Sequence, residues 1–233
     1  MLRELIYNIR INRTHGASLS QLKHYFRWKK SFRPAASSVV DEQPWITFDA
    51  IDKLKELIRP DFKVFEYGGG GSTFFFVKRC NEVITAEHND IWFKILTQKL
   101  EGKTKGKWKG HLIEAEQGDR VVNPDKANPD HYSSDDIPSK GTNYFKYASA
   151  IDQFADNYFD IVLVDGRSRP SCMKHSIPKL KSGGYLVLDN SDRDYYLPFF
   201  KDVLSQKFTL ILNNTGPTPY CREFTQTSIW KKN

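Results

Sequence analysis

Cysteine is scarce in this chain of 233 residues, and long apolar runs are absent. The three cysteines, Cys80, Cys172 and Cys221, are widely spaced and form no CxxC pair, which excludes a disulfide framework. No purely apolar run is longer than residues 74–77, whereas a membrane-spanning helix needs roughly 20 such residues. The N-terminus shows no apolar core followed by a small-residue cleavage site. From these absences we expect a cytoplasmic protein.

Acidic side chains are nearly missing from residues 1–33, where Glu4 is the single acid among eight basic residues. The basic residues are Arg3, Arg10, Arg13, Lys23, Arg27, Lys29, Lys30 and Arg33. This segment therefore carries a charge of +7, which equals the net charge of the whole chain. The excess positive charge thus belongs to an N-terminal extension and says little about the rest of the chain.

Apolar residues of this extension repeat at helical spacing, among them Leu2, Leu5, Ile6 and Ile9. In one interpretation the helix binds an anionic surface, and a peripheral membrane contact through residues 1–33 is then expected. In the other, which we favour, its apolar face packs on the core or on a second subunit, as in a homodimer. We expect an extension and linker at residues 1–45 and one domain at residues 46–233.

Strands and helices alternate along most of that domain. The expected strands are residues 63–67, 82–87, 111–115, 160–165 and 184–189, and the expected helices are residues 48–59, 72–80, 90–100 and 172–180. Such alternation predicts an α/β fold with a mostly parallel sheet and helices on both faces. The last two strands, residues 208–212 and 227–230, have no helix between them, which predicts an antiparallel hairpin at one edge.

Residues 116–147 interrupt this alternation with a stretch rich in Asp, Asn, Pro and Ser. A loop of this length in a compact domain is usually functional or disordered. We expect it to be a substrate lid with Tyr144 and Tyr147 at its hinge.

Four consecutive glycines, Gly68–Gly71, lie between the first strand and its helix. Glycines at such a place let the backbone approach a ligand, and the N–H groups at the start of the helix favour anionic groups. Glu66 precedes the glycines, and its carboxylate suits a cationic ligand group. Glu87 ends the next strand 19 residues after Gly68, the spacing at which an acidic side chain reaches a ribose diol. A dinucleotide fingerprint fails because Thr73 stands where its third glycine is required.

These residues resemble the motifs of class I S-adenosylmethionine-dependent methyltransferases over residues 46–233. Glu66-x-Gly68-x-Gly70-x-Ser72 resembles the first motif and residues 85–88 the second, while residues 159–165 and 180–185 resemble the fourth strand and the turn before the fifth. The resemblance implies a Rossmann-like sheet of seven strands with S-adenosylmethionine as cofactor. It implies that Glu66, Gly68, Gly70 and Ser72 lie near the methionine part, that Glu87 holds the ribose, and that His88 and Asp119 lie near the adenine.

Asp165 and the pair Asp189-Asn190 end two neighbouring strands of the expected sheet. Oxygen-rich strand ends of this kind can hold Mg²⁺, and the pattern is similar to the metal site of catechol-type O-methyltransferases. The lysine that this family has after the first aspartate is absent, because Arg167 and Arg169 follow instead. Asp165 is then the candidate catalytic base. In the alternative, Asp165 orders its loop and Asp189-Asn190 makes a turn.

The favoured function is methyl transfer to a small-molecule or saccharide acceptor at oxygen. Nucleic-acid methylation is disfavoured because the chain has no N-P-P-Y or D-P-P-Y motif and no Pro-Cys pair. Two alternatives stay open. An aminopropyltransferase would share the glycine loop, Glu87 and Asp165, although Arg167 stands close to where that family has a second acid. A non-catalytic adaptor would bind nucleic acid or membrane through residues 1–33.

Overall fold

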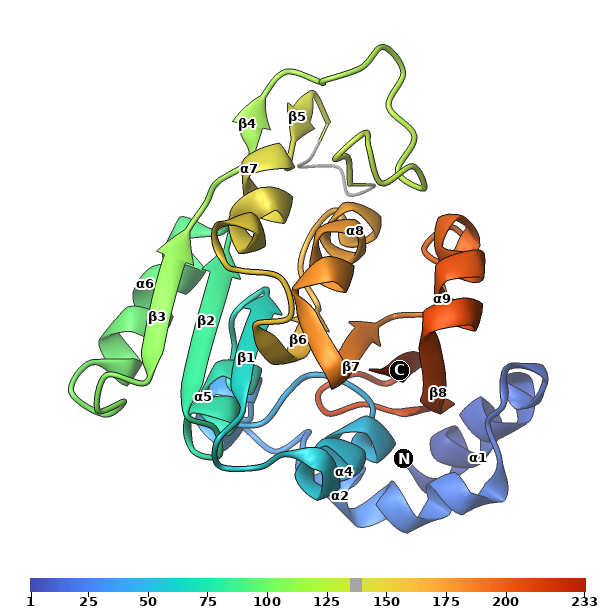
Figure 1. Ribbon diagram of the computed structural model, residues 1–233. Coiled ribbons are helices and arrows are strands. Elements are labelled where there is room, and N and C mark those ends of the chain that lie inside the picture. The colour runs from blue at the N-terminus through green and yellow to red at the C-terminus, as the bar shows by residue number, and fades with distance from the viewer. Residues whose placement is uncertain (135–139) are drawn as a thin grey trace.

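A seven-stranded sheet forms the centre of the computed structural model, which describes residues 1–134 and 140–233 (Figure 1). Its strand order is β3-β2-β1-β6-β7-β9-β8. The strands are β1 (Lys63–Tyr67), β2 (Glu82–Glu87), β3 (Trp108–Leu112), β6 (Phe159–Val164), β7 (Leu180–Asp189), β8 (Phe208–Pro217) and β9 (Phe224–Lys232). The first five in this order pair in parallel, and β9 pairs antiparallel with both β7 and β8. The predicted fold class, with its C-terminal antiparallel hairpin, is confirmed.

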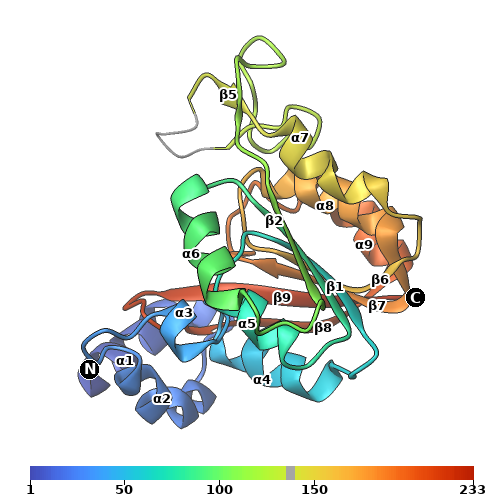
Figure 2. The same ribbon diagram turned by 90° about the vertical axis from the view of Figure 1, so that its left-hand side faces the viewer.

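Helices cover both faces of the sheet (Figure 2). One face carries α4 (Phe48–Leu57), α5 (Gly71–Val77) and α6 (Asp90–Leu100), and the other carries α7 (Phe145–Ala148), α8 (Arg169–Lys179) and α9 (Lys201–Lys207). Alternate residues of each strand face the two layers: Val64 packs beside α4 and α5, whereas Phe65 packs toward α8. This period of two is what a sheet buried on both faces requires.

The third strand is the one clear error among the predicted strands. It was expected at residues 111–115, but β3 runs from Trp108 to Leu112, pairing Val83 with Trp108 and Glu87 with Leu112. This edge strand is half exposed and has no regular alternation of apolar and polar residues, so its sequence gave little signal. The Trp108 indole Nε1 donates to Thr85 Oγ1 at 2.9 Å, which ties the start of the strand to β2.

Residues 1–45 pack against the same core as the sheet. They form α1 (Leu2–Ile11), α2 (Tyr25–Lys30), α3 (Ser38–Asp41) and the 3₁₀ turns η1 (Arg13–His15) and η2 (Leu19–His24). Leu5, Ile9 and Trp28 are buried in the cluster that includes Phe48. Trp28 Nε1 also donates to the carbonyl oxygen of Cys221 at 2.8 Å. These contacts agree with the interpretation in which the apolar face of this segment packs on the core. Among the described residues, no helix is long and apolar enough to cross a bilayer.

Residues 116–134 and 140–147 rise above the carboxyl ends of the strands (Figures 1 and 2). They contain a short antiparallel pair, β4 (Glu116–Gln117) and β5 (Thr142–Asn143), and lead into α7 and the 3₁₀ turn η4 (Ser149–Gln153). Tyr144 and Tyr147 are buried in the core cluster of the α8 face. Residues 135–139, inside the predicted lid, lie outside the described residues, so the lid stays a prediction.

Candidate active site

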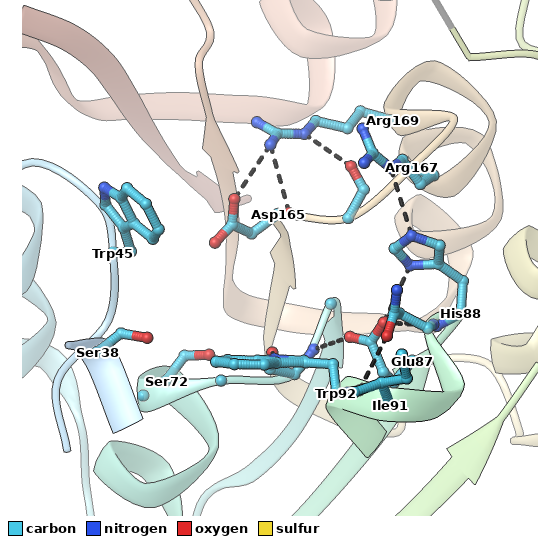
Figure 3. A pocket seen from close by; sticks show the side chains of 16 residues that line it. Ser38, Trp45, Ser72, Glu87, His88, Ile91, Trp92, Asp165, Arg167 and Arg169 are labelled. Atoms are coloured by element: carbon cyan, nitrogen blue, oxygen red, sulfur yellow. Dashed lines mark hydrogen bonds and ion pairs between the residues drawn. The ribbon is translucent and has the colours of Figure 1, made fainter. Parts of the chain in front are cut away.

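A cavity of about 630 Å³ opens at the carboxyl ends of β1, β2 and β6 (Figure 3). Its size falls within the roughly 300–1,000 Å³ typical of small-molecule sites. The lining comes from the glycine loop, the β2–α6 junction, the β6–α8 turn and the N-terminal segment: Ser38, Trp45, Gly68 to Ser72, Glu87, His88, Asn89, Ile91, Trp92, Asp165, Gly166, Arg167 and Arg169. In an open α/β sheet this edge is where ligands bind.

The glycine loop brings three chain segments into contact. Gly68 has φ of +88°, and a Cβ built there would lie 3.1 Å from the Asp165 carbonyl oxygen. A Cβ on Gly71 would fall 2.0 Å from the carbonyl oxygen of Gln43, so a side chain there would push the segment after α3 away. Gly70 has only looser neighbours, the nearest being Ser38 Oγ at 3.8 Å. A Cβ on Gly69 would lie 2.5 Å from Leu96 Cδ1, so three of the four glycines serve packing and Gly70 is the one with space beside it.

Glu66 lies beneath this loop and does not line the cavity. Its side chain is completely buried and accepts hydrogen bonds from Ser72 Oγ and Thr85 Oγ1, each at 2.7 Å, and from Thr73 Oγ1. Burial raises the pKa of Glu66 to about 7, although the three hydroxyl donors favour the ionised form. In the structure Glu66 thus holds the glycine loop through these three hydroxyl groups and does not itself line the cavity, and its place near the methionine part of a cofactor stays a prediction.

Glu87 ends β2 and lines the cavity, as expected from its spacing. Its Oε1 accepts from the backbone N–H groups of His88 and Asn89 at 2.8 and 2.7 Å, and its Oε2 accepts from the N–H of Gly69 at 2.8 Å. Burial would raise the pKa of Glu87, but hydrogen bonds and charge from His88, Asn89 and Gly69 hold it below the ordinary value. Because a carboxylate oxygen has two lone pairs, Oε2 can accept one further hydrogen bond from a ligand.

His88 is held between a carboxylate and a guanidinium. Its Nδ1 lies 3.0 Å from Glu87 Oε1, and its Nε2 accepts from Arg167 Nε at 3.3 Å. Nδ1 makes no hydrogen bond within the described residues. The ring also packs edge-on against Tyr144 and Tyr147, with centroids 6.0 and 5.8 Å away. His88 therefore forms a fixed wall on the side of the cavity opposite Trp45 (Figure 3).

Asp119 is exposed and lies outside the cavity lining. Two features of the structure account for this. The third strand ends at Leu112, so residues 113–115 follow it at the sheet edge. Gly118 and Asp119 come later, beyond β4, in the stretch that rises away from the sheet. The predicted adenine contact by Asp119 is thus not brought to this site.

Arg169 lies between the two carboxylates that were expected to bind a metal. Its Nη2 lies 3.1 Å from Asp165 Oδ1 and its Nη1 lies 3.6 Å from Asp189 Oδ2, while its Nε donates to the Gly166 carbonyl oxygen at 3.0 Å. Nη1 also donates to the Asp189 carbonyl oxygen. Among the described residues, no group of three His, Cys, Asp or Glu side chains could hold a metal ion.

Asp165, Asp189 and Asn190 therefore do not fit Mg²⁺, because a protein cation already neutralises the two carboxylates. Asp189 Oδ1 also accepts from Thr227 Oγ1 at 2.8 Å, so both carboxylate oxygens of Asp189 already have a partner in the protein. Burial and the nearby charge of Asp189 raise the pKa of Asp165 well above its ordinary value in spite of Arg169. Asp165 is thus a carboxyl with raised proton affinity at the edge of the cavity.

A second cavity of about 330 Å³ adjoins the first and shares Trp45, Asp165 and Arg169 with it. The other residues that line it are Asp189, Asn190, Thr218, Cys221 and Thr225. It lies over the carboxyl end of β7 and the connection between β8 and β9. The two cavities meet at the carboxylate of Asp165.

Several residues that line the first cavity could not be predicted from the sequence. Ser38 and Trp45 lie in a segment that reads as a linker, and only the fold brings them to the glycine loop. Ile91 and Trp92 stand in the first turn of α6, where Asn89 caps the helix by accepting from the Trp92 N–H at 2.8 Å. That capping residue, two positions after Glu87, was the one local signal that the start of α6 faces the site.

Comparison of the sequence with protein-family models and with curated proteins gives no match. Solved structures do match the fold. A methyltransferase of Streptococcus mutans, solved in complex with S-adenosylhomocysteine, superposes with a TM-score of 0.53 and 13% identity over 78% of this chain and 94% of that one. The chain therefore has the Rossmann-like fold of class I S-adenosylmethionine-dependent methyltransferases.

Two further matches have lower TM-scores. An rRNA methylase of Streptococcus thermophilus gives 0.49 with 12% identity, over 78% of this chain and 92% of that one. A spermidine synthase of Thermotoga maritima gives 0.47 with 15% identity, over 76% of this chain and 56% of that one. A shared fold does not identify a substrate, so function has to be argued from the site.

Proposed function

We propose that this chain is an S-adenosylmethionine-dependent methyltransferase that acts at oxygen on a small-molecule or saccharide acceptor. One observation carries the proposal. A carboxylate with a free lone pair, Glu87, and a carboxyl of raised pKa, Asp165, line one cavity beside the glycine loop. The first suits a ribose diol, and the second stands where a second cavity begins.

The lining supports S-adenosylmethionine as the ligand of the first cavity. Glu87 Oε2 would accept from a ribose hydroxyl, and the start of α6 with Ile91 and Trp92 would cover the adenine beside His88. Gly68, Gly70 and Ser72 would lie along the methionine part, and Asp165 would compensate its ammonium charge. In this proposal Glu66 contributes only through the loop that it holds.

S-adenosylmethionine supplies a methyl group on a cationic sulfur, so the cofactor itself brings the activation. The protein then has to align the acceptor and to remove its proton. Asp165 is the proposed base: it would take the proton of an acceptor hydroxyl as that oxygen forms its bond to the methyl carbon and the bond from this carbon to sulfur breaks, leaving its electron pair on sulfur. Arg169 fixes the orientation of Asp165, and no metal is needed for this step because its guanidinium already occupies the position between Asp165 and Asp189.

Two other functions are less well supported. A polyamine acceptor, as an aminopropyltransferase would need, meets Arg167 and Arg169 in the lining, and like charges repel. An adaptor would bind through residues 1–33, but Leu5, Ile9 and Trp28 of that segment are buried against the sheet layer, so part of its apolar surface is used in packing.

Calorimetric titration with S-adenosylmethionine and S-adenosylhomocysteine, with and without Mg²⁺ and against NADH, tests the proposal. We expect micromolar binding of both sulfur ligands, no dependence on Mg²⁺ and no binding of NADH. Glu87→Ala should weaken S-adenosylhomocysteine at least 100-fold, because it removes the ribose acceptor and leaves several backbone N–H groups unpaired, at roughly 1–3 kcal/mol each. Glu114→Ala removes an exposed carboxylate outside the lining and is the matched control. Wild-type protein that binds neither sulfur ligand would refute the proposal.

A further inference from the structure

The second cavity contains two buried hydroxyl groups without hydrogen-bond partners. Thr218 is 1% exposed, and within the described part of the chain its Oγ1 has no hydrogen-bond partner. The same holds for Oγ1 of Thr225, whose hydroxyl oxygen is buried although the residue as a whole is half-buried. Both residues line the second cavity. Leaving a buried hydroxyl unpaired costs roughly 1–3 kcal/mol, so two such groups in residues that line one cavity point to a ligand that completes their hydrogen bonding.

The charge of this cavity limits which ligands fit. Its lining holds the carboxyls of Asp165 and Asp189 and one cation, Arg169, which lies between them. No lysine or second arginine lines it to receive a phosphate group. Arg169 would also lie beside any cationic group that entered. A neutral ligand therefore meets the least unfavourable electrostatics here.

The shape and polarity of the lining favour a ring that has both hydroxyl groups and an apolar face. Threonine hydroxyls can donate and accept, as can the amide of Asn190, so they match groups that also do both. Trp45 supplies a flat aromatic surface at the junction of the two cavities and is half exposed. Its ring packs edge-on against Tyr220, with centroids 5.8 Å apart, which fixes its position. A volume of about 330 Å³ lies at the lower end of the range for ligand sites and favours one ring.

We infer that the second cavity is the acceptor subsite and that it takes a neutral, hydroxyl-rich ring, that is, a saccharide. Thr218 and Thr225 are its specificity-determining hydroxyls, and Trp45 packs against the apolar face of the ring. This inference rests on the proposed methyltransferase function, because it places the acceptor hydroxyl at Asp165. It goes further in naming the acceptor chemistry and the residues that select it.

The test uses the full chain saturated with S-adenosylhomocysteine, so that the first cavity is filled. Saturation-transfer NMR measures binding of methyl glucoside, methyl mannoside, methyl galactoside and methyl rhamnoside at millimolar concentration, with putrescine and a short RNA hairpin as comparison ligands. We expect at least one glycoside to bind and both comparison ligands to fail. Binding of the RNA or of putrescine in competition with the glycosides, or no glycoside binding at all, would overturn the inference.

Matched variants sharpen this test. Thr218→Val and Thr225→Val remove only the hydroxyl, so each should weaken the glycoside about 5-fold while leaving the Tm unchanged or higher. Thr209→Val removes an exposed hydroxyl on β8 that bonds to Asn233 Oδ1, and it should leave glycoside binding as in the wild type. Glycoside binding that is unaffected by both cavity variants would count against the subsite.

The same samples separate the two proposals. If wild-type protein binds S-adenosylhomocysteine but none of the glycosides, the saccharide subsite is refuted and the methyltransferase proposal stands. If it does not bind S-adenosylhomocysteine, the methyltransferase proposal fails and the subsite inference fails with it.

Discussion

The two halves of the carboxyl edge of the sheet satisfy their polar groups in different ways. In the half formed by β1 and β2, Glu66 accepts from three hydroxyl groups and Glu87 accepts from three backbone N–H groups. His88 Nδ1 lies near Glu87 there but makes no hydrogen bond within the described residues. In the half formed by β7, β8 and β9, Thr218 and Thr225 have no such partner among the described residues, and two carboxyls share Arg169.

This difference indicates which half is complete before a ligand binds. A site whose groups are already held in place loses little conformational freedom on binding, as expected for a cofactor that every reaction cycle uses. Buried groups left unpaired lower stability, and proteins retain them where function needs them. The carboxylates of the β1–β2 half therefore already have protein donors, whereas the hydroxyls of Thr218 and Thr225 in the other half have hydrogen bonds still to make.

Replacing the shared cation should give the largest effect. Arg169→Met leaves Asp165 and Asp189 facing each other without compensation, so the free energy of unfolding should fall by about 3–5 kcal/mol. Added Mg²⁺ should then stabilise this variant, because the position between the carboxylates becomes available to a metal. Urea unfolding with and without Mg²⁺ measures both effects.

Arg167→Met is the control for that experiment, because it lines the same cavity but bonds to His88 instead of bridging the carboxylates. It should gain nothing from Mg²⁺. Stabilisation of the wild-type protein by Mg²⁺ would contradict the assignment of Arg169 as the resident cation.

Glu66 should make stability depend on pH in the β1–β2 half. Its pKa is raised to about 7 in the folded chain from 4.5, so the folded state binds more protons than the unfolded state between these values. Its contribution to stability is complete below pH 4.5 and is lost as the pH rises through 7, a change of about 3 kcal/mol. Glu66→Gln should remove this decrease, and Glu101→Gln, an exposed control, should retain it. Urea unfolding at pH 5 and pH 8 gives the answer, and an unchanged decrease in Glu66→Gln would assign it to another group.

The smallest expected effect concerns the cap of α6. Asn89→Ala removes the acceptor for the Trp92 N–H and should lower the free energy of unfolding by about 1 kcal/mol. Because Ile91 and Trp92 lie in that first turn, S-adenosylhomocysteine binding should weaken a few-fold. Thr97→Ala alters an exposed residue of the same helix and should leave binding unchanged. A loss of binding as large as that of Glu87→Ala would contradict a purely local role of the cap.

The part of the fold that depends on local pattern could be predicted from the sequence. β1, β2 and α6 have the predicted bounds because buried strands and an amphipathic helix leave clear periodicities. The edge strand β3 has no such pattern and was misplaced, and with it the region in which Asp119 was sought.

The site shows the same division. Glu87, at a fixed spacing from the glycines, was identified as a lining residue from the sequence. The positions of Trp45 and Arg169 in the site could not be predicted from the sequence, because they depend on contacts between segments that lie far apart in the chain. Arg169 was noted as a charge near Asp165, but only the folded structure shows that it bridges to Asp189.

At Gly71 the glycine loop contacts the N-terminal segment around α3. The carbonyl oxygens of Ser38 and Gln43 lie so close to Gly71 that no side chain fits there, and Ser38 and Trp45 form one wall of the first cavity. A ligand that contacts Ser38 and Trp45 in that cavity gains those contacts only when the N-terminal segment is docked. By thermodynamic linkage, ligand binding must hold the segment down, and docking of the segment must tighten the ligand by the same factor.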